Sequence, residues 1–126
     1  MSKGTETGET VDLKVVISFE RGFRAYQDTL AAAMRILRPN AQIVTVGPEE
    51  VGATVERFGP DVVIGSPIKK TDVENVPAWV ELSLDPARLS TVSVKGYHSE
   101  IVNPTLDRLM MIMEEVASTH QEGALG

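Results

Sequence analysis

The sequence predicts an α/β fold in which parallel strands in the spatial order 2-1-3 are extended by an antiparallel β-meander. Residues 13–19 and 61–65 are nearly continuous apolar runs, which is the composition of strands buried on both faces. Amphipathic helical segments separate the first three strands, and this β-α-β-α-β order predicts right-handed crossovers and a parallel sheet. The later strands alternate apolar and polar residues, which is typical of antiparallel strands with one open face.

The first helix is expected over residues 21–37, because apolar side chains recur there at helical spacing. Pro39 and Asn40 then end the helix, and a second strand follows over residues 42–46. The predicted apolar stripe of this helix consists of Phe23, Tyr26, Leu30, Ala33, Met34 and Leu37.

A second helix is expected after Gly47, because Pro48 suits the first turn of a helix and two acidic residues follow it. Gly59 and Pro60 end this helix before the third strand, which is expected over residues 61–65. The predicted apolar stripe consists of Val51, Val55 and Phe58.

The second half of the chain predicts a β-meander. Residues 67–78 hold two prolines, two lysines and few apolar groups, so a full helix is not expected there. Strands are expected over residues 79–84 and 91–95, and only six residues separate them. A parallel return needs a dozen or more residues, so these strands are expected to form an antiparallel hairpin. A tight turn at Lys95–Gly96 then leads into a short strand near residues 98–102.

The alternation of apolar and polar residues in these late strands implies that no helix covers one face of this half of the sheet. Aromatic side chains on an exposed face often mark a contact, so we expect this face to meet a second copy of the chain in a homodimer. The residues predicted on the open face are Trp79, Glu81, Ser83, Thr91, Ser93 and Tyr97.

The last helix is expected to begin after Asn103–Pro104. Met111 and Ile112 fall outside its apolar stripe. They indicate either a broadly buried helix or a second apolar face that meets a partner, because methionine suits adaptable surfaces. The stripe itself consists of Leu106, Leu109, Met110, Met113 and Val116.

Length and composition favour one domain, predicted over residues 11–117, with disordered tails at residues 1–10 and 118–126. The net charge of −6 argues against binding to nucleic acid, which needs clustered Lys and Arg. The absence of cysteine excludes disulfides and thiolate metal sites. No run approaches the ~20 apolar residues that cross a bilayer, and the first residues lack the apolar stretch of a signal peptide. We therefore expect a cytoplasmic protein that binds no membrane.

Residues 13–66 resemble the receiver domain of bacterial response regulators, which has a flavodoxin-like fold. The resemblance lies in the order and spacing of the elements and in the segment Phe58–Ile64, which is similar to the family's entry into its third strand. The last helix also fits, whereas the third and fourth helices of the family have no counterpart. The resemblance implies about three helices and a shortened, atypical receiver-like domain of signal transduction.

The reaction centre of that family has no counterpart in this sequence. In the family the first strand ends in two acids that hold magnesium, and the third ends in an aspartate that accepts the phosphoryl group. Here Ser18 and Phe19 occupy the positions of the two acids. Ser66, or Gly65 if the register slips, occupies the position of the aspartate that accepts the phosphoryl group. Magnesium needs hard oxygen ligands, so we expect no metal and no other cofactor. The resemblance implies a non-catalytic module, not an enzyme, that cannot accept phosphate on aspartate and binds an unknown regulatory protein.

An alternative function is the binding of a small anion or nucleotide in a crevice between residues 18–24 and residues 66–70. Such sheets bind ligands at the carboxyl ends of their strands, and free N–H groups at a helix start suit an anion. The same residues also suit an ordinary turn and a loop with exposed cations. The candidate ligand-binding residues are Ser18, Glu20, Arg21, Arg24, Ser66 and Lys69.

Overall fold

The computed structural model describes residues 13–83, 85, 87–102 and 104–125, and the side chains as far as residue 117. Among these residues, six strands form a single sheet. The strands are β1 (Leu13–Phe19), β2 (Ala41–Thr45), β3 (Val62–Ser66), β4 (Ala78–Glu81), β5 (Ser90–Val94) and β6 (Tyr97–Ile101).

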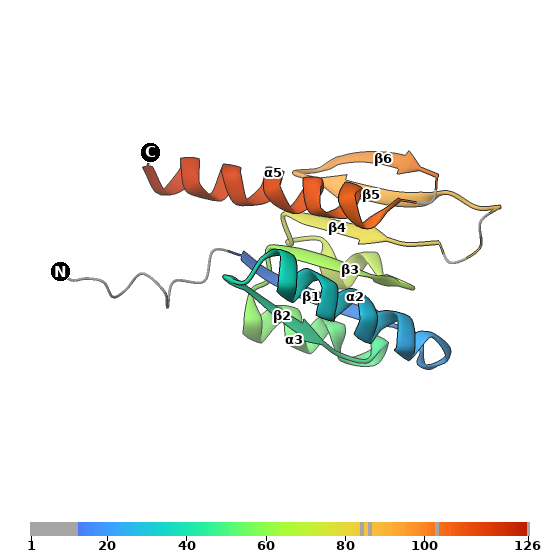
Figure 1. Cartoon of the computed structure of the whole chain (residues 1–126). Helices are drawn as coiled ribbons and strands as arrows, with labels where there is room; N and C mark the ends of the chain where they lie inside the picture. Colours follow the sequence, from blue (N-terminus) through green and yellow to red (C-terminus); the bar gives the residue numbers. More distant parts are fainter. Residues whose placement is uncertain (1–12, 84, 86, 103, 126) are drawn as a thin grey trace.

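The strands lie in the spatial order β2-β1-β3-β4-β5-β6 (Figure 1). β1 pairs in parallel with β2 and β3, and β4 pairs in parallel with β3. β5 runs antiparallel to β4, and β6 runs antiparallel to β5. The expected α/β fold, with a parallel 2-1-3 core followed by antiparallel strands, is therefore confirmed.

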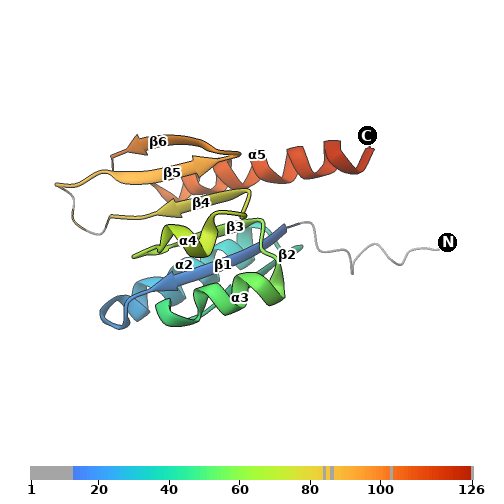
Figure 2. The ribbon, with the colours of Figure 1, turned by 180° about the vertical axis from the view of Figure 1, so that it is seen from behind.

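Four α-helices and two 3-10 turns accompany the described strands, and the last helix follows the last strand. They are η1 (Arg21–Phe23), α2 (Arg24–Leu37), η2 (Pro48–Glu50), α3 (Val51–Phe58), α4 (Lys70–Val73) and α5 (Leu106–Leu125). In Figures 1 and 2, α2 and α5 cover one face of the sheet, whereas α3 and α4 cover the other face. The single turn of α4 adds a fourth helix to the three that we expected.

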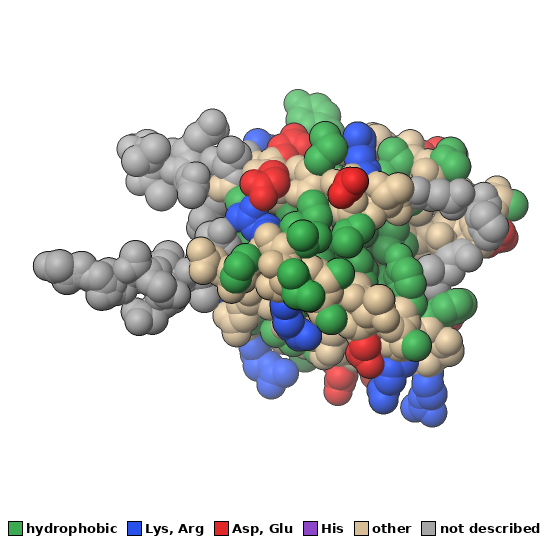
Figure 3. Space-filling model, viewed as in Figure 1, with side chains coloured by type: hydrophobic (Ala, Val, Ile, Leu, Met, Phe, Trp, Pro, Cys, Tyr) green, Lys and Arg blue, Asp and Glu red, His purple; other side chains and the backbone are tan. Residues whose placement is uncertain are grey.

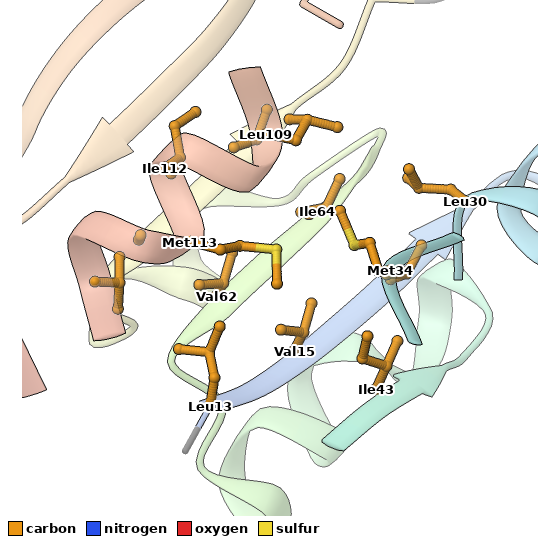
Figure 4. Close-up of a cluster of buried hydrophobic side chains, with 14 of the residues drawn as sticks. Leu13, Val15, Leu30, Met34, Ile43, Val62, Ile64, Leu109, Ile112 and Met113 are labelled. Carbon is orange, nitrogen blue, oxygen red and sulfur yellow. The ribbon is translucent and has the colours of Figure 1, made fainter. Parts of the chain in front are cut away.

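The larger core lies between the sheet and the layer of α2 and α5 (Figure 4). Alternate side chains of β1 and β3 point into it, because successive residues of a strand face opposite sides of a sheet. Two methionines, Met34 on α2 and Met113 on α5, are fully buried there. Its other labelled members in Figure 4 are Leu13, Val15, Leu30, Ile43, Val62, Ile64, Leu109 and Ile112.

The buried face of α2 differs from the apolar stripe expected for it. Its buried residues are Gln27, Leu30, Ala31 and Met34, which are spaced to form one helix face. Three members of the expected stripe are exposed instead, namely Phe23, Tyr26 and Leu37. The helix is therefore rotated relative to the prediction, because small Ala31 and Gln27 take positions against the sheet and leave bulky side chains on the flank.

The prediction that Trp79 lies on an uncovered face was wrong. Trp79 is only 5% exposed, and it packs in a second core between the sheet and the layer of α3 and α4. Three apolar residues of the segment before β4 cover it, because α4 folds this segment back over the sheet. These residues are Ile68, Val73 and Val76.

Tyr97 does not share a face with Trp79, which also differs from the prediction. Tyr97 pairs with Val94, which packs against the larger core on the α5 side. The residues of β6 on the Trp79 side are His98 and Glu100, which pair with Ser93 and Thr91. Ser93 is buried rather than open, whereas Figure 2 shows no helix over β5 and β6 on this side. The uncovered face is therefore smaller and more polar than expected.

The last helix is longer than expected. α5 continues to Leu125, so helix replaces most of the disordered tail predicted at residues 118–126. The side chain of Thr105 caps the N-terminus of the helix, because its Oγ1 accepts a hydrogen bond from the N–H of Arg108 at 3.2 Å. Met111 is exposed, whereas Ile112 is buried in the larger core. The predicted cap Asn103 and the tail at residues 1–10 lie outside the described residues.

Candidate functional sites

The first depression of the surface lies where β1 and β2 end, and it has a volume of about 650 Å³. Two hydrogen bonds position its walls. The side-chain oxygen Oε1 of Gln27 accepts a hydrogen bond from the N–H of Phe19 at 2.8 Å, which ties the start of α2 to the end of β1. The N–H of Glu20 donates to the carbonyl oxygen of Ser66 at 3.1 Å, which ties the same loop to β3.

The charges around this depression do not favour an anion. Four carboxylates line it against two guanidinium groups, so its lining carries a net negative charge. One of the carboxylates is already engaged, because Glu50 Oε1 accepts a hydrogen bond from the N–H of Gly47 at the start of η2. The charged lining residues are Glu20, Arg21, Arg24, Asp28, Glu49 and Glu50.

The structure divides the six predicted ligand-binding residues among different places. Glu20, Arg21 and Arg24 line the first depression together. Ser66 lines a second depression, and Lys69 is exposed next to α4. Ser18 is 1% exposed, because its side chain faces the layer of α3 and α4 and lies under it. Pro67 also lines the first depression, so part of the predicted crevice between residues 18–24 and 66–70 is present there, without the side chains of Ser18, Ser66 and Lys69.

Ser18 has an unusual environment for a polar residue. Its Oγ is buried and has no hydrogen-bond partner among the described residues. Its carbonyl oxygen lies against Gly65 of β3, so close that a Cβ atom at position 65 would overlap it. Glycine at position 65 therefore permits the close approach of β1 and β3 at their ends.

The second depression lies where β3 and β4 end, and it has a volume of about 270 Å³. Its polar side chains are largely engaged in holding loops. Glu81 Oε2 accepts a hydrogen bond from the N–H of Ile68 at 2.9 Å, which fixes the segment before α4. Ser83 Oγ donates to the carbonyl oxygen of Asp85 at 3.0 Å, and the N–H of Ser83 donates to Ser90 Oγ. Glu81 and Ser83 are half-buried loop supports rather than the open surface that we expected.

The groove between α2 and α5 is the apolar feature of the surface that the sequence did not predict. Figure 3 shows hydrophobic side chains gathered over the region between these two helices. The groove has a volume of about 180 Å³, and Arg38 and Glu114 form an ion pair between the later parts of α2 and α5. Burial raises the pKa of Tyr26 on its wall. The residues that line it are Tyr26, Thr29, Leu30, Ala33, Leu106 and Leu109.

Sequence reasoning missed this groove because α2 and α5 are far apart in the chain. The signal was present in the excess of apolar residues in this region, since Phe23 of η1 and Tyr26 and Leu37 of α2 were all assigned to the core and are exposed in the structure. An apolar stripe wider than the buried face of a helix indicates a surface that meets something else.

No group of three or more metal-ligating side chains lies together within the part of the chain that the structure describes. None of the described helices is sufficiently long and apolar to cross a membrane. The fold defines an α/β protein with a mixed six-stranded sheet. No family model matches the chain, and no curated protein or solved structure is significantly similar to it.

Proposed function

We propose that this protein is a non-catalytic regulatory module that acts by binding another protein, with the groove between α2 and α5 as the docking surface. The observation that carries the proposal is the exposure of an aromatic side chain on the wall of this apolar groove. Tyr26 lines the groove and is 42% exposed, and Phe23 of η1, three residues before it, is 40% exposed. Aromatic residues of this kind are enriched in the contacts that dominate protein–protein binding.

The shape of the groove favours an amphipathic helix as its occupant. α2 and α5 both start at the strand-end edge of the sheet, so they form two walls that run in the same direction (Figure 1). The lining residues of α2, from Tyr26 to Ala33, give a wall about 11 Å long. A helix lying between such walls inserts apolar side chains at positions i, i+3, i+4 and i+7. The exposed Tyr26 would contact that helix on one side.

The polar side chains at the strand ends are engaged in holding the structure, which supports a binding role for the protein rather than a reaction at the strand ends. Glu81, Ser83, Gln27 and Glu50 each hold a loop or a helix start through hydrogen bonds. Glu20 and Ser66, two of the candidate ligand-binding residues, line different depressions. The resemblance to receiver domains with an altered reaction centre agrees with this role, because it implies signalling through contacts rather than phosphotransfer.

Site-specific crosslinking tests the docking surface. A photo-crosslinking amino acid replaces Ala33, which lines the groove, or Glu56, which is exposed on α3 and serves as the control. In native cells, position 33 is expected to give an adduct with one other protein that position 56 does not give. Tyr26→Asp in the same chain should abolish the adduct, because it places a charge in an apolar contact. An adduct that is equal at both positions, or that survives Tyr26→Asp, contradicts the proposal.

A second experiment tests the absence of phosphotransfer. Incubation with acetyl phosphate and magnesium is expected to leave the mass of the folded chain unchanged. Stoichiometric addition of one phosphoryl group would refute the non-catalytic assignment, whatever the crosslinking shows.

A further inference from the structure

β6 is an outer edge of the sheet, at the opposite end from β2 (Figure 2). Within the described residues it pairs with β5 on one side and with no strand on the other. Its side chains are all exposed or half-buried, and Tyr97 is 82% exposed. An edge strand offers a row of N–H and C=O groups that a further strand can pair with.

The turn before β6 determines which of its residues offer those groups. Lys95 and Gly96 have φ angles of 52° and 86°, which suit a two-residue hairpin turn of type I′. The residues flanking such a turn, Val94 and Tyr97, exchange hydrogen bonds. Because hydrogen-bonded pairs alternate along an antiparallel ladder, His98 and Glu100 direct their backbone groups away from β5.

We propose that β6 pairs antiparallel with β6 of a second copy of this chain, with Ser99 on the two-fold axis. In this register His98 lies opposite the partner's Glu100, and Glu100 lies opposite the partner's His98. Tyr97 lies opposite the partner's Ile101, so aromatic and β-branched side chains meet on the other face. An imidazole N–H facing a carboxylate can donate a hydrogen bond to it, and an aromatic side chain facing a β-branched one stabilises neighbouring strands.

The surroundings of the strand fit this arrangement on both faces. On one face the His98 ring contacts the buried Trp79 ring, with centroids 5.6 Å apart, which holds the imidazole in place beside the edge. On the other face a hollow of about 420 Å³ lies between β6 and α5, lined by Tyr97, Ser99 and Ile112. This hollow would lie next to the two-fold axis and leaves room for the partner's side chains.

A second copy is the occupant because β6 is complementary to itself. A two-fold interface brings each residue at position 98 against position 100 of the other copy. This strand carries an imidazole, which can donate a hydrogen bond, at position 98 and a carboxylate, which accepts one, at position 100. Five residues of strand make a small interface, at the low end of the range for specific complexes, so we expect a dimer that dissociates on dilution. This inference does not depend on the groove between α2 and α5, because Arg108 and Ile112 lie on the opposite flank of α5 from Leu106 and Leu109.

Sedimentation equilibrium of the native chain and two variants tests the register. The native chain is expected to show twice the chain mass at micromolar concentration and to dissociate on dilution. His98→Glu places two carboxylates opposite each other at two symmetric positions, and should raise the dissociation constant about tenfold. The exchange variant His98→Glu/Glu100→His restores the pairing of unlike groups and should recover most of the loss. Both positions are exposed, and circular dichroism checks that the variants fold.

A single engineered cysteine provides a second test, because the chain has none of its own. Ser99 would face its own copy in a non-hydrogen-bonded pair, with Cα atoms about 4.5 Å apart, within the range that a disulfide spans. Ser99→Cys should therefore crosslink rapidly on mild oxidation. Gln42→Cys, exposed on the other edge strand, serves as the control and should crosslink only slowly.

Three results would overturn the inference. The first is a native chain that stays monomeric throughout the micromolar range. The second is a dimer whose dissociation constant is unchanged by His98→Glu, which would place the interface elsewhere. The third is Ser99→Cys crosslinking no faster than Gln42→Cys. A monomer that instead binds a strand peptide of another sequence falls under the first result.

Discussion

Gly65 shows how a single residue determines the geometry of the strand ends. Ser18 of β1 pairs with Gly65 of β3, and the carbonyl of Ser18 occupies the space that a side chain at position 65 would need. The obstacle is backbone rather than the tip of a flexible side chain, so it cannot move aside without displacing β1. The approach of the two strands therefore depends on the missing Cβ atom.

Gly65→Ala is expected to lower the free energy of unfolding by roughly 2 kcal/mol, because overpacking forces a backbone shift. Urea denaturation of the purified chain measures the change. Gly22→Ala is the matched control, because a Cβ atom there would meet nothing within 4 Å, and its effect should stay within about 1 kcal/mol. Equal effects of the two substitutions would show that β1 and β3 are not in close contact.

Tyr26 provides a titratable probe of the groove. Partial burial raises its pKa, so the native state favours the neutral phenol. The resulting stabilisation is complete below the ordinary tyrosine pKa of about 10, and it is lost as the pH rises through the raised value.

Spectrophotometric titration of a Tyr97→Phe variant isolates Tyr26, since the chain has two tyrosines. The folded variant is expected to ionise at a higher pH than the same variant unfolded in urea. A midpoint that is the same in both states would mean that Tyr26 projects freely into water rather than lying against the groove.

At the scale of elements, the segment between β3 and β4 decides what the second half of the sheet exposes. Residues 67–77 carry prolines and lysines, yet they place Ile68, Val73 and Val76 over Trp79. Glu81 holds this segment through the N–H of Ile68. The single helical turn of α4 therefore covers the face of the sheet around Trp79, which the alternation of apolar and polar residues in the strands predicted to be exposed.

Trp79→Ala is expected to lower the free energy of unfolding by at least about 3 kcal/mol, because it leaves a cavity under α4. Trp79→Phe, which keeps an aromatic ring in place, should cost clearly less. Thermal and urea unfolding followed by circular dichroism measures both. A loss within about 0.5 kcal/mol for Trp79→Ala would mean that the side chain is at the surface, as its alternating strand first indicated.

The strands and their pairing were predictable, whereas the surfaces were not. Continuous apolar runs predicted β1 and β3, and the short connection after β4 predicted the antiparallel hairpin, because both are local properties of the chain. The cover over Trp79 was missed because Ile68, Val73 and Val76 are too few and too irregularly spaced to predict a helix. The groove was missed because it depends on the separation between α2 and α5, which no local pattern of residues encodes.

At the scale of the whole molecule, the three surfaces differ in chemistry. The strand-end depression beside β1 and β2 is rich in carboxylates, the groove between α2 and α5 is apolar, and the β6 edge offers unpaired backbone groups. We therefore expect the groove to meet a partner protein and the β6 edge to meet a second copy. Their separation on opposite flanks of α5 allows both contacts at once.

Hydrogen exchange of the chain with and without the protein captured at position 33 tests the central claim most directly. The account predicts that the partner slows exchange in α2 and in the first turns of α5, and leaves residues 45–50 at the strand ends unchanged. Protection of residues 45–50, with α2 and α5 exchanging as they do in the free chain, would contradict it.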